Sequence, residues 1–401
     1  MAMKLYTLDE TCLENARAGL KQPFSPLQLA LSKLVSEADI LRREAPESVV
    51  HKKLRPASGD AHDYYSLGTY WWPNPRRPNG LPYIRRDGHI NPQCENNDTD
   101  TSRIIRMCER CLTLGLAWYF TGQRQYAQAA ATQIRCWFLD ADTRMNPHLN
   151  YGQAIPGIVS GRGTGLIDTR LMWMVVDTIG LINTASVLDT DDIIGLHQWF
   201  RDFNHWMYYS EIGHSEYVWH NNHGTWYDAQ RTVNALFYGD KGLAARIIEQ
   251  GITQRMAAQI DQDGRQTMEL ERTIPFHYSL FNLEAHLLLN RYAEHVEFDR
   301  WNTIRDGRGV KQGIDYLVPF IREPELWPYS DLQGIVWDSA LRVLLQSVRG
   351  YAKQSASYRD ALKCVPQETL QLKEQLMWCP GGKNNASCLP TALCLVGLAD
   401  M

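Results

Sequence analysis

Hydrophobic residues recur at helical spacing over most of the chain beyond Thr99. Between Ile104 and Tyr119 they occur every three or four residues, which places them on one face of a helix. Gly122 interrupts this pattern, and a second helical pattern continues to about Leu139. The spacing therefore predicts two helices joined by a short turn, which together form a helical hairpin.

A second hairpin is predicted from the same plan. Residues 226–237 define a helix face, residues 239–240 form a turn, and residues 243–260 continue as a helix. The hairpins share a short sequence, Trp-Tyr-Phe-Thr-Gly at 118–122 and Ala-Leu-Phe-Tyr-Gly at 235–239. Further helical patterns cover residues 166–187, 190–208, 279–292, 309–322, 334–350 and 357–376. Alternating strand patterns are scarce, so we predict an all-α fold, an α-solenoid or an α/α toroid, in a single domain over residues 1–401.

The segments between these helices are long and rich in aromatic, arginine and asparagine residues. They cover residues 56–98, 142–165, 209–222 and 261–277. Long ordered loops in a compact domain commonly carry function. In a toroid such loops gather at the ends of the barrel, so we expect a binding cleft there, with residues 56–98 as an aromatic lid or cleft wall.

The charge balance excludes a whole-molecule attraction to polyanions. The chain has 41 Lys plus Arg against 45 Asp plus Glu, a formal net charge of −4, so neither nucleic acid nor a membrane is expected as a partner. An acidic polymer would need a local basic groove. The 13 Trp and 19 Tyr suit the flat faces of sugar rings, although core packing explains most of them individually.

The cysteines do not form a disulfide framework of the kind found in small secreted proteins. Nine is an odd number, and no second pair follows Cys108 and Cys111, which argues against a metal or redox site there. Cys379 and Cys388 flank a turn and are candidates for a local disulfide, a question left open. No metal and no cofactor are expected.

The N-terminal residues 1–10 lack the apolar region of a signal peptide, and no apolar run is long enough to span a membrane. We therefore expect a soluble protein. Met1-Ala2-Met3 resembles the start of an expressed mature protein, so a periplasmic or secreted location with the export signal removed stays open, as does the oligomeric state.

Four polar and aromatic stretches stand out from the helical pattern. They are Asp63-Tyr-Tyr-Ser-Leu-Gly-Thr-Tyr-Trp-Trp-Pro, Leu149-Asn-Tyr-Gly-Gln through Gly161-Arg-Gly, His220-Asn-Asn-His-Gly-Thr-Trp-Tyr-Asp and Glu269-Leu-Glu-Arg-Thr-Ile-Pro-Phe-His-Tyr-Ser. With them the chain resembles the alginate lyase superfamily over roughly residues 60 to 290. It is most similar to polysaccharide lyase family 38, whose members act on alginate or glucuronan, and more distantly to the mannuronan lyases of family 5. The resemblance implies an incomplete α/α toroid of six or seven helical pairs and cleavage of a 1,4-linked polyuronate by β-elimination, which gives 4,5-unsaturated uronate ends.

The reaction requires removal of the C5 proton beside a carboxylate and protonation of the departing O4. Because the ionised carboxylate makes that proton a poor acid, the enzyme needs donors that neutralise it. Asn222, His223 and Arg272 offer an amide, an imidazole and a guanidinium, and Asn222 and His223 match the family residues that bind the carboxylate. The alternative reading is that Asn221 or Asn222 caps a helix that begins near His223.

Tyr278 matches the family tyrosine and is the expected base. Arg272, six positions earlier, would favour its ionised form. On mannuronate or glucuronate H5 and O4 lie on the same face of the ring, so one tyrosine can serve as base and acid. The family 5 enzymes place this arginine and tyrosine seven apart with a glycine after the arginine, whereas here Pro275 intervenes, which leaves the roles of Arg272 and His277 open.

Other residues are predicted to bind substrate. Arg162 is expected to pair with a carboxylate at a neighbouring subsite, with Gln153 nearby, although an ordinary surface arginine would also fit. Glu269 would orient Arg272 or bind a hydroxyl group. The complete predicted substrate-binding set is Tyr65, Tyr70, Trp71, Trp72, Gln153, Arg162, Asn221, Glu269 and His277.

Two other functional classes stay open at this stage. A pair drawn from Asp261, Asp263, Glu269 and Glu271 would make a toroidal glycoside hydrolase, although residues 261–265 have the sequence of a turn. A non-catalytic polyuronate-binding protein is the other. His214, His220 and His223 lack the spacing of a zinc motif. The sequence does not choose between mannuronate, guluronate and glucuronate, or between endo and exo action.

Overall fold

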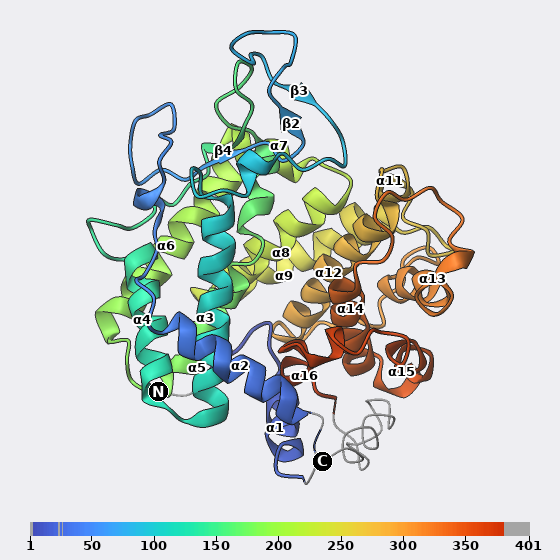
Figure 1. The fold of residues 1–401 in the computed structure, drawn as a ribbon. Helices are drawn as coiled ribbons and strands as arrows, with labels where there is room; N and C mark the ends of the chain where they lie inside the picture. The colour runs from blue at the N-terminus through green and yellow to red at the C-terminus, as the bar shows by residue number, and fades with distance from the viewer. Residues whose placement is uncertain (1–2, 23–24, 26, 381–401) are drawn as a thin grey trace, which may run out of the picture. The chain divides into compact units, whose positions relative to one another are not determined.

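The computed structural model describes residues 3–22, 25 and 27–380, and these divide into two compact units. The first unit takes residues 3–6 and 40–251, and the second takes the remaining described residues. The expected single domain over residues 1–401 stays a prediction. Both units are built mainly of helices, and short strands occur in the first (Figure 1).

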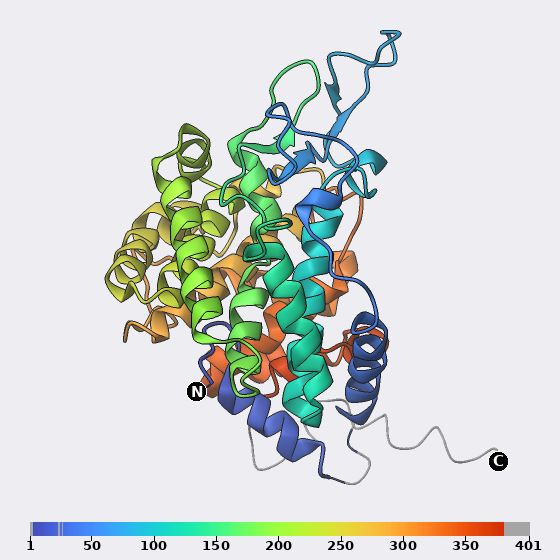
Figure 2. The same ribbon diagram turned by 90° about the vertical axis from the view of Figure 1, so that its left-hand side faces the viewer.

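Helices form most of the first unit. They are α3 (Thr101–Thr121), α4 (Arg124–Phe138), α5 (Trp173–Asn183), α6 (Thr190–Tyr209), α7 (Glu211–Tyr217), α8 (Asn222–Phe237) and α9 (Lys241–Gly251). Short 3-10 helices cover Val49–His51, Pro92–Cys94 and Gly163–Thr169. Helix α3 packs against α4 and α5, and α8 packs against α9, α6 and α5 (Figures 1 and 2).

Both predicted hairpins are confirmed, and a glycine ends the first helix of each. Gly122 after α3 has a φ of 69° and Gly239 after α8 a φ of 93°, a left-handed conformation that glycine adopts without steric cost.

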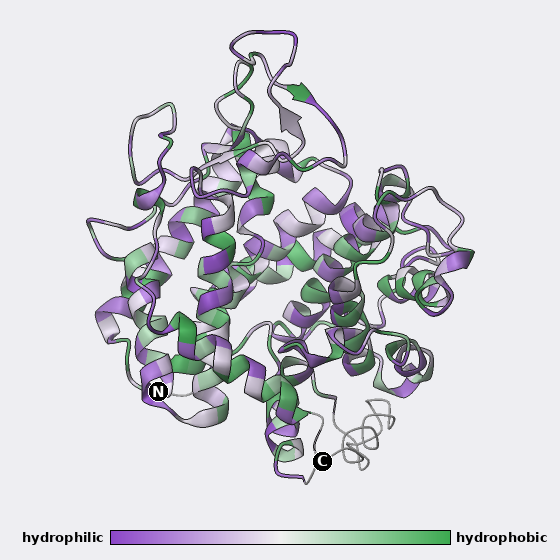
Figure 3. Ribbon diagram, in the orientation of Figure 1, coloured by the Kyte–Doolittle hydropathy of each residue, from purple (hydrophilic) through white to green (hydrophobic). Residues whose placement is uncertain are grey.

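The core of this unit contains an aromatic cluster in which the Phe138 ring centre lies 4.7 Å from that of Trp199 and 5.5 Å from that of Phe200. The helices of both units carry hydrophobic and hydrophilic residues side by side, as amphipathic helices do (Figure 3).

Short strands organise the long segment before α3. Strand β1 (Tyr65–Leu67) pairs in parallel with β4 (Tyr151–Ala154), and β2 (Trp71–Trp72) pairs antiparallel with β3 (Ile84–Arg85). In both views the chain around β2 and β3 projects beyond the ends of the helices of this unit (Figures 1 and 2). Two segments predicted as loops, 56–98 and 142–165, are thus joined by backbone hydrogen bonds.

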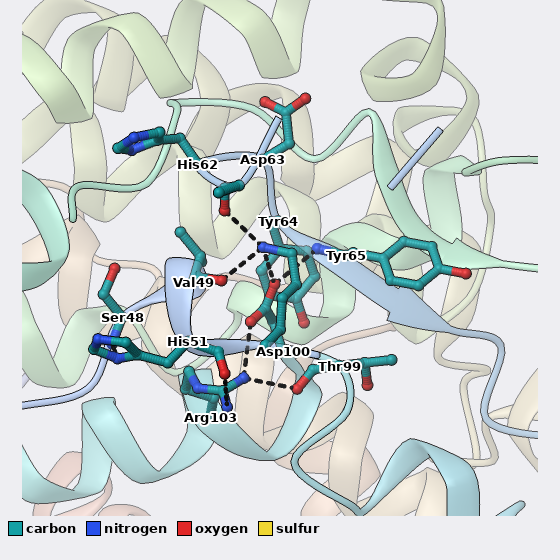
Figure 4. Close-up of polar contacts among 12 residues, drawn as sticks. Ser48, Val49, His51, His62, Asp63, Tyr64, Tyr65, Thr99, Asp100 and Arg103 are labelled. Atoms are coloured by element: carbon teal, nitrogen blue, oxygen red, sulfur yellow. Dashed lines mark hydrogen bonds and ion pairs between the residues drawn. The ribbon is translucent and has the colours of Figure 1, made fainter. Parts of the chain in front are cut away.

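A buried ion cluster fixes the start of β1 to the start of α3 (Figure 4). Asp100 accepts a hydrogen bond from the Tyr65 backbone N–H at 3.0 Å, and its carboxylate lies 3.2 Å from Lys52 Nζ and 3.1 Å from Arg103 Nη1. Burial raises the pKa of Asp100 and lowers that of Lys52. Removing one partner would leave a buried charge uncompensated, so the cluster holds the aromatic segment in place.

The second unit is built around one buried helix. Its helices are α1 (Glu10–Gly19), most of α2 (Leu27–Leu41), α10 (Ala257–Gln259), α11 (Thr267–Leu270), α12 (Pro275–Glu294), α13 (Val310–Arg322), α14 (Trp337–Gly350), α15 (Ala356–Leu362) and α16 (Glu374–Met377). A π-helical turn covers Ile252–Met256, and 3-10 turns cover Pro324–Leu326, Ala352–Gln354 and Thr369–Gln371. Helix α12 packs against α11, α13 and α14.

The centre of the second unit is partly polar. His286 on α12 is fully buried, and Arg300 donates to its Nδ1 at 3.0 Å and to its carbonyl at 2.9 Å. Burial, with Arg300 and Arg255 nearby, lowers the pKa of His286 well below its ordinary value. The neutral ring can then donate from Nε2 to Gln259, which lies 3.2 Å away.

Some predicted helix boundaries are wrong. The predicted helix 357–376 is broken into α15, a 3-10 turn and α16, because Pro366 lacks the N–H that a continuous helix needs. The predicted helix 243–260 is interrupted by the π-helical turn, and 166–187 begins as a 3-10 helix. Helices α7 and α11 lie in predicted loops, and α1 and α2 were not predicted. None of the described helices is long and apolar enough to cross a membrane.

Candidate active site

The first group of candidate residues lies at the start of α8. Asn221 is the N-cap, and its side chain accepts a hydrogen bond from the His223 backbone N–H at 3.1 Å. The capping interpretation is therefore confirmed for Asn221. Asn222 follows in the first turn and is 1% exposed.

His223 is paired with a buried glutamate that the sequence analysis did not identify. His223 Nδ1 lies 2.6 Å from Oε1 of Glu216 on α7, and the Glu216 side chain is 1% exposed. An ionised carboxylate only accepts hydrogen bonds, so Nδ1 carries the proton and Nε2 is left for another partner. The Trp219 side chain is exposed, and the centre of its ring lies 6.2 Å from the centre of the His223 ring.

Arg162 is held by Gln153 through two hydrogen bonds. Its Nε donates to the Gln153 carbonyl at 3.0 Å, and its Nη2 donates to Gln153 Oε1 at 2.9 Å. Gln153 has a φ of 46°, which is uncommon for a residue with a side chain. The predicted neighbourhood of Arg162 and Gln153 is therefore confirmed, and the arginine has a fixed direction.

Asp168 lies behind Gln153 and is a second carboxylate that the sequence analysis missed. It is fully buried and accepts hydrogen bonds from Ser66 Oγ at 2.6 Å, Tyr64 Oη at 3.0 Å and Gln153 Nε2 at 3.1 Å. Burial raises the pKa of this carboxyl group, while the three donors act in the opposite direction. Ser66 precedes Asp168 by 102 positions, so no local pattern could show the contact.

The predicted aromatic residues are partly exposed and lie on β1, β2 and the turn between them. Trp72 donates from Nε1 to the His89 carbonyl at 2.9 Å, and Arg86 lies 5.3 Å from its ring. Trp71 lies close to Gly68, where an added Cβ would come within 2.7 Å of its Cδ1. Tyr65 and Tyr70 are half-buried, and their predicted roles stay predictions.

In the second unit, Arg272 and Tyr278 are in direct contact. Arg272 Nη2 donates to Tyr278 Oη at 2.8 Å, and the guanidinium carbon lies 3.8 Å from the centre of the tyrosine ring. Pro275 is the first residue of α12, which suits its fixed φ and missing N–H, and Tyr278 lies in the first turn. The expected proximity of the two side chains is confirmed.

Glu269 and His277 are the other predicted site residues of this segment. Glu269 is 1% exposed, and its backbone carbonyl accepts from the Arg272 N–H at 3.2 Å. The His277 ring is stacked against Phe281 at 5.7 Å. The roles predicted for Glu269 and His277 stay predictions.

The acidic residues proposed for a hydrolase lie in different environments. Residues 261–265 form the predicted turn, in which the Asp261 N–H donates to the Arg265 carbonyl at 2.8 Å and Gly264 has a φ of 87°. Asp263 forms an exposed ion pair with Arg265 at 2.7 Å. Glu271 is exposed.

Other predictions concern metals and thiols. Within the described residues, no group of three or more His, Cys, Asp or Glu side chains is arranged to hold a metal ion. Cys108 and Cys111 are buried in α3, and burial raises the pKa of the Cys111 thiol to about 12. Cys388, the candidate partner of Cys379, lies outside the described residues.

A family model described as alginate lyase matches residues 48–327, which is more than half of the chain. The chain belongs to the alginate lyase family. It is similar to the crystal structure of an alginate lyase from Bacteroides ovatus, with a TM-score of 0.87 and 33% identity over 94% of this chain and 99% of that chain. No curated protein sequence matches it.

More distant structures of the alginate lyase family show the same fold. Alginate lyase A1-III from Sphingomonas species A1 has a TM-score of 0.52 and 14% identity over 86% of this chain and 94% of that chain. A tyrosine-to-phenylalanine variant of A1-III, complexed with a tetrasaccharide, has a TM-score of 0.54 and 14% identity over 87% and 95% of the two chains. The all-α toroid prediction is confirmed, and the chain is a polysaccharide lyase.

Proposed function

We propose that this alginate lyase family member cleaves a 1,4-linked polyuronate by β-elimination, with Tyr278 as both base and acid. The contact between Arg272 and Tyr278 carries this proposal. A guanidinium that donates to the phenol oxygen at 2.8 Å stabilises the negative charge that the oxygen bears after losing its proton. Tyr278 then removes H5 and afterwards donates that proton to O4, while the C4–O4 bond breaks and a C4–C5 double bond forms.

Asn222, His223 and Arg272 neutralise the uronate carboxylate in this proposal. Loss of H5 moves negative charge onto the carboxylate, so donors aimed at it stabilise the transition state more than the ground state. The Glu216 carboxylate at 2.6 Å from His223 Nδ1 supports this role, because it fixes the orientation of the ring and leaves Nε2 for the substrate. Asn222 contributes an amide donor.

The flanking sugars are assigned to the aromatic and arginine residues of the first unit. Arg162 is directed by Gln153, and Trp71 and Trp72 present partly exposed indole rings. Aromatic faces stack on sugar rings, and a guanidinium pairs with a carboxylate through two parallel hydrogen bonds. We place residues 56–98 in the substrate-binding surface of one lyase domain.

The substrate is an acidic polysaccharide, and alginate, polymannuronate and glucuronan are the candidates. The Bacteroides ovatus and Sphingomonas structures are alginate lyases by their descriptions, which supports alginate. A single tyrosine acting on one face of the ring supports mannuronate or glucuronate, in which H5 and O4 share a face. Guluronate presents H5 and O4 on opposite faces and would need a second group.

The test is to incubate the purified protein separately with polymannuronate, polyguluronate and glucuronan. Elimination produces an ultraviolet absorbance from the C4–C5 double bond, and we expect it with one of the polymers that favour a single tyrosine. Tyr278→Phe should retain binding and lose about 100-fold or more of the rate. Tyr358→Phe is a matched control, since this buried tyrosine of the second unit donates to Asp315 at 2.6 Å.

The other outcomes identify other functions. Reducing ends without absorbance would mean hydrolysis, and binding without either signal would mean a non-catalytic protein. A near-normal rate for Tyr278→Phe would remove Tyr278 from its role as base and acid.

A further inference from the structure

The Arg162 guanidinium is half-buried, and among the described residues no carboxylate lies within ion-pair distance of it. Its hydrogen-bond partners are two oxygens of one neutral residue, the carbonyl and Oε1 of Gln153. A partly buried cation normally acquires an ionised partner, because removing it from water is unfavourable. Among the described residues the charges of Asp168 and Glu216 act on the guanidinium only from beyond ion-pair distance.

Gln153 stands between Arg162 and the buried carboxylate of Asp168. Its Nε2 donates to Asp168 at 3.1 Å, and its Oε1 accepts from Arg162 at 2.9 Å. Because an ionised carboxylate only accepts hydrogen bonds, Asp168 determines which end of the amide faces it. The oxygen must then face Arg162. The orientation of the amide follows from the carboxylate, and the direction of the guanidinium follows from the amide.

Asp168 and the Gln153 backbone are themselves rigidly held. Ser66 Oγ and Tyr64 Oη donate to the carboxylate at 2.6 and 3.0 Å, and the Gln153 N–H donates to Ser66 Oγ at 2.7 Å. The φ of 46° at Gln153 persists in a buried residue because these contacts fix it. Unusual backbone conformations of this kind are found where a side chain must point in a required direction.

The surroundings of Arg162 place it beside an aromatic side chain. A Cβ added to Gly68 would lie 3.0 Å from Arg162 Nη2 and 2.7 Å from Trp71 Cδ1. Glycine at this position lets the guanidinium and the indole ring both approach the same stretch of backbone. A cation and a flat apolar face side by side suit a sugar ring that carries a carboxylate.

We propose that Asp168 is a positioning residue, which acts through the Gln153 amide to hold Arg162 uncompensated for the carboxylate of a flanking uronate. The neutral amide fixes the arginine as a carboxylate would, but it leaves the positive charge available to substrate. With Nε and one hydrogen of Nη2 engaged, Nη1 and the other Nη2 hydrogen bind the substrate carboxylate. This inference rests on the proposed function and adds the residues that set the affinity of a subsite.

The experiment uses the polymer from which the wild-type protein produces unsaturated ends. In Asp168→Asn, the new amide keeps the Ser66 and Tyr64 hydrogen bonds through its oxygen and therefore presents its NH2 group to Gln153. The Gln153 oxygen must then turn towards position 168, which directs the Gln153 NH2 group towards Arg162. We expect KM to rise about tenfold and kcat to stay within about threefold. Asp192→Asn is the matched control, because it makes the same substitution in the same unit at a carboxylate that pairs with Arg135 instead.

A double-mutant cycle separates positioning from a general effect on the fold. In an Arg162→Met background, Asp168→Asn should change KM less than about twofold, because the guanidinium it positions is absent. Gln153→Met is the second variant should Asp168→Asn fail to fold, and it should raise KM about tenfold only when Arg162 is present. Raised salt should weaken substrate binding more in the wild type than in Arg162→Met.

Three results would overturn the inference. They are an unchanged KM in both the Asp168→Asn and Gln153→Met proteins, the same rise in KM in the Arg162→Met background, and an equal rise in KM in Asp192→Asn. Absence of unsaturated ends in the wild-type protein would instead reject the proposed function. The two failures are therefore distinguishable.

Discussion

The two units support their candidate residues in opposite ways. In the first unit, buried carboxylates lie behind the polar groups, with Glu216 behind His223 and Asp168 behind the Gln153–Arg162 pair. In the second unit, Arg272 lies directly on Tyr278, with its guanidinium carbon 3.8 Å from the ring centre. The first arrangement fixes donors that bind a carboxylate, and the second stabilises charge on a phenol oxygen.

This difference separates binding from chemistry. Residues that hold a flanking uronate, whose carboxylate gains no charge in the reaction, contribute equally to the ground state and the transition state, so their loss acts mainly on KM. A group that stabilises charge present only during the reaction acts on kcat. We therefore expect kcat effects to be largest in the second unit and KM effects to prevail at Arg162 and Trp71 in the first.

The largest effect after loss of Tyr278 itself is expected at Arg272. Arg272→Met removes the donor to the phenol oxygen and a donor to the carboxylate, so kcat should fall about 100- to 1,000-fold. Arg272→Lys keeps the charge but not the planar geometry and should recover only part of the rate. Steady-state kinetics measure both variants.

Arg265→Met is the control for Arg272. Arg265 is an exposed arginine of the same unit, paired with Asp263 at 2.7 Å, and its loss should leave kcat near the wild-type value. If Arg272→Met kept most of its turnover, the contact with Tyr278 would be structural, and the contrast between the units would fail.

The next largest effect is expected at Glu216. Glu216→Gln still accepts a hydrogen bond from His223 Nδ1 but removes the negative charge that strengthens this hydrogen bond. Hydrogen bonds to charged groups contribute enough that kcat/KM should fall about 10- to 100-fold.

Glu211→Gln tests the same helix without the contact, since Glu211 is exposed in the first turn of α7. An unchanged kcat/KM in Glu216→Gln, with only reduced thermal stability, would make Glu216 a structural partner. Glu216 would then not support His223 in the reaction.

Much of the helical fold can be predicted from local sequence patterns. The hairpin of α3 and α4 was predictable because apolar spacing and Gly122 are both visible without the structure. The failures have local causes of a different kind. Pro366 interrupts the predicted helix 357–376, and the π-helical turn Ile252–Met256 shifts the helical register within an otherwise continuous pattern.

The site was predictable where its residues are close in sequence. Arg272 and Tyr278 are six positions apart, and the short link through Pro275 allows their contact. Glu216 was missed because it faces His223 only when residues 211–217 form a helix, which the sequence did not predict. Asp168 was missed because its donors at positions 64 and 66 are about a hundred residues away, brought close by the pairing of β1 with β4.

A smaller effect, confined to binding, is expected at Trp71. The indole ring lies beside Gly68, as Arg162 does, so Trp71→Ala should raise KM about 2- to 10-fold and leave kcat unchanged. Trp71→Phe retains an aromatic face and should restore most of the affinity. A kcat loss in Trp71→Ala at constant KM would contradict the assignment of Trp71 to binding.

The smallest expected effect is on the free energy of unfolding, which burial of the ionised Asp168 carboxylate lowers. Burial raises the folded-state pKa of Asp168 above its ordinary value, so the folded protein binds this proton more tightly than the unfolded chain does. Its contribution to the free energy of unfolding is therefore fully present below pH of about 4 and is lost as the pH rises through the folded-state pKa. Asp168→Asn lacks this loss, so urea unfolding should show the variant gaining stability relative to the wild type from pH of about 4 upwards.

Asp192 provides the opposite case in the same unit. Burial acts to raise its pKa, but the hydrogen bonds from Arg135 and the Asp189 N–H, with the Arg135 charge, lower it overall. Its stabilisation is present above the unfolded-state pKa and is lost as the pH falls through the folded-state pKa, so Asp192→Asn should lose stability relative to the wild type as the pH rises towards about 4. If the free energy of unfolding of the two variants, relative to the wild type, changed with pH in the same direction, burial of Asp168 would not destabilise the folded protein. The buried carboxylate would then give no support to a role in positioning substrate.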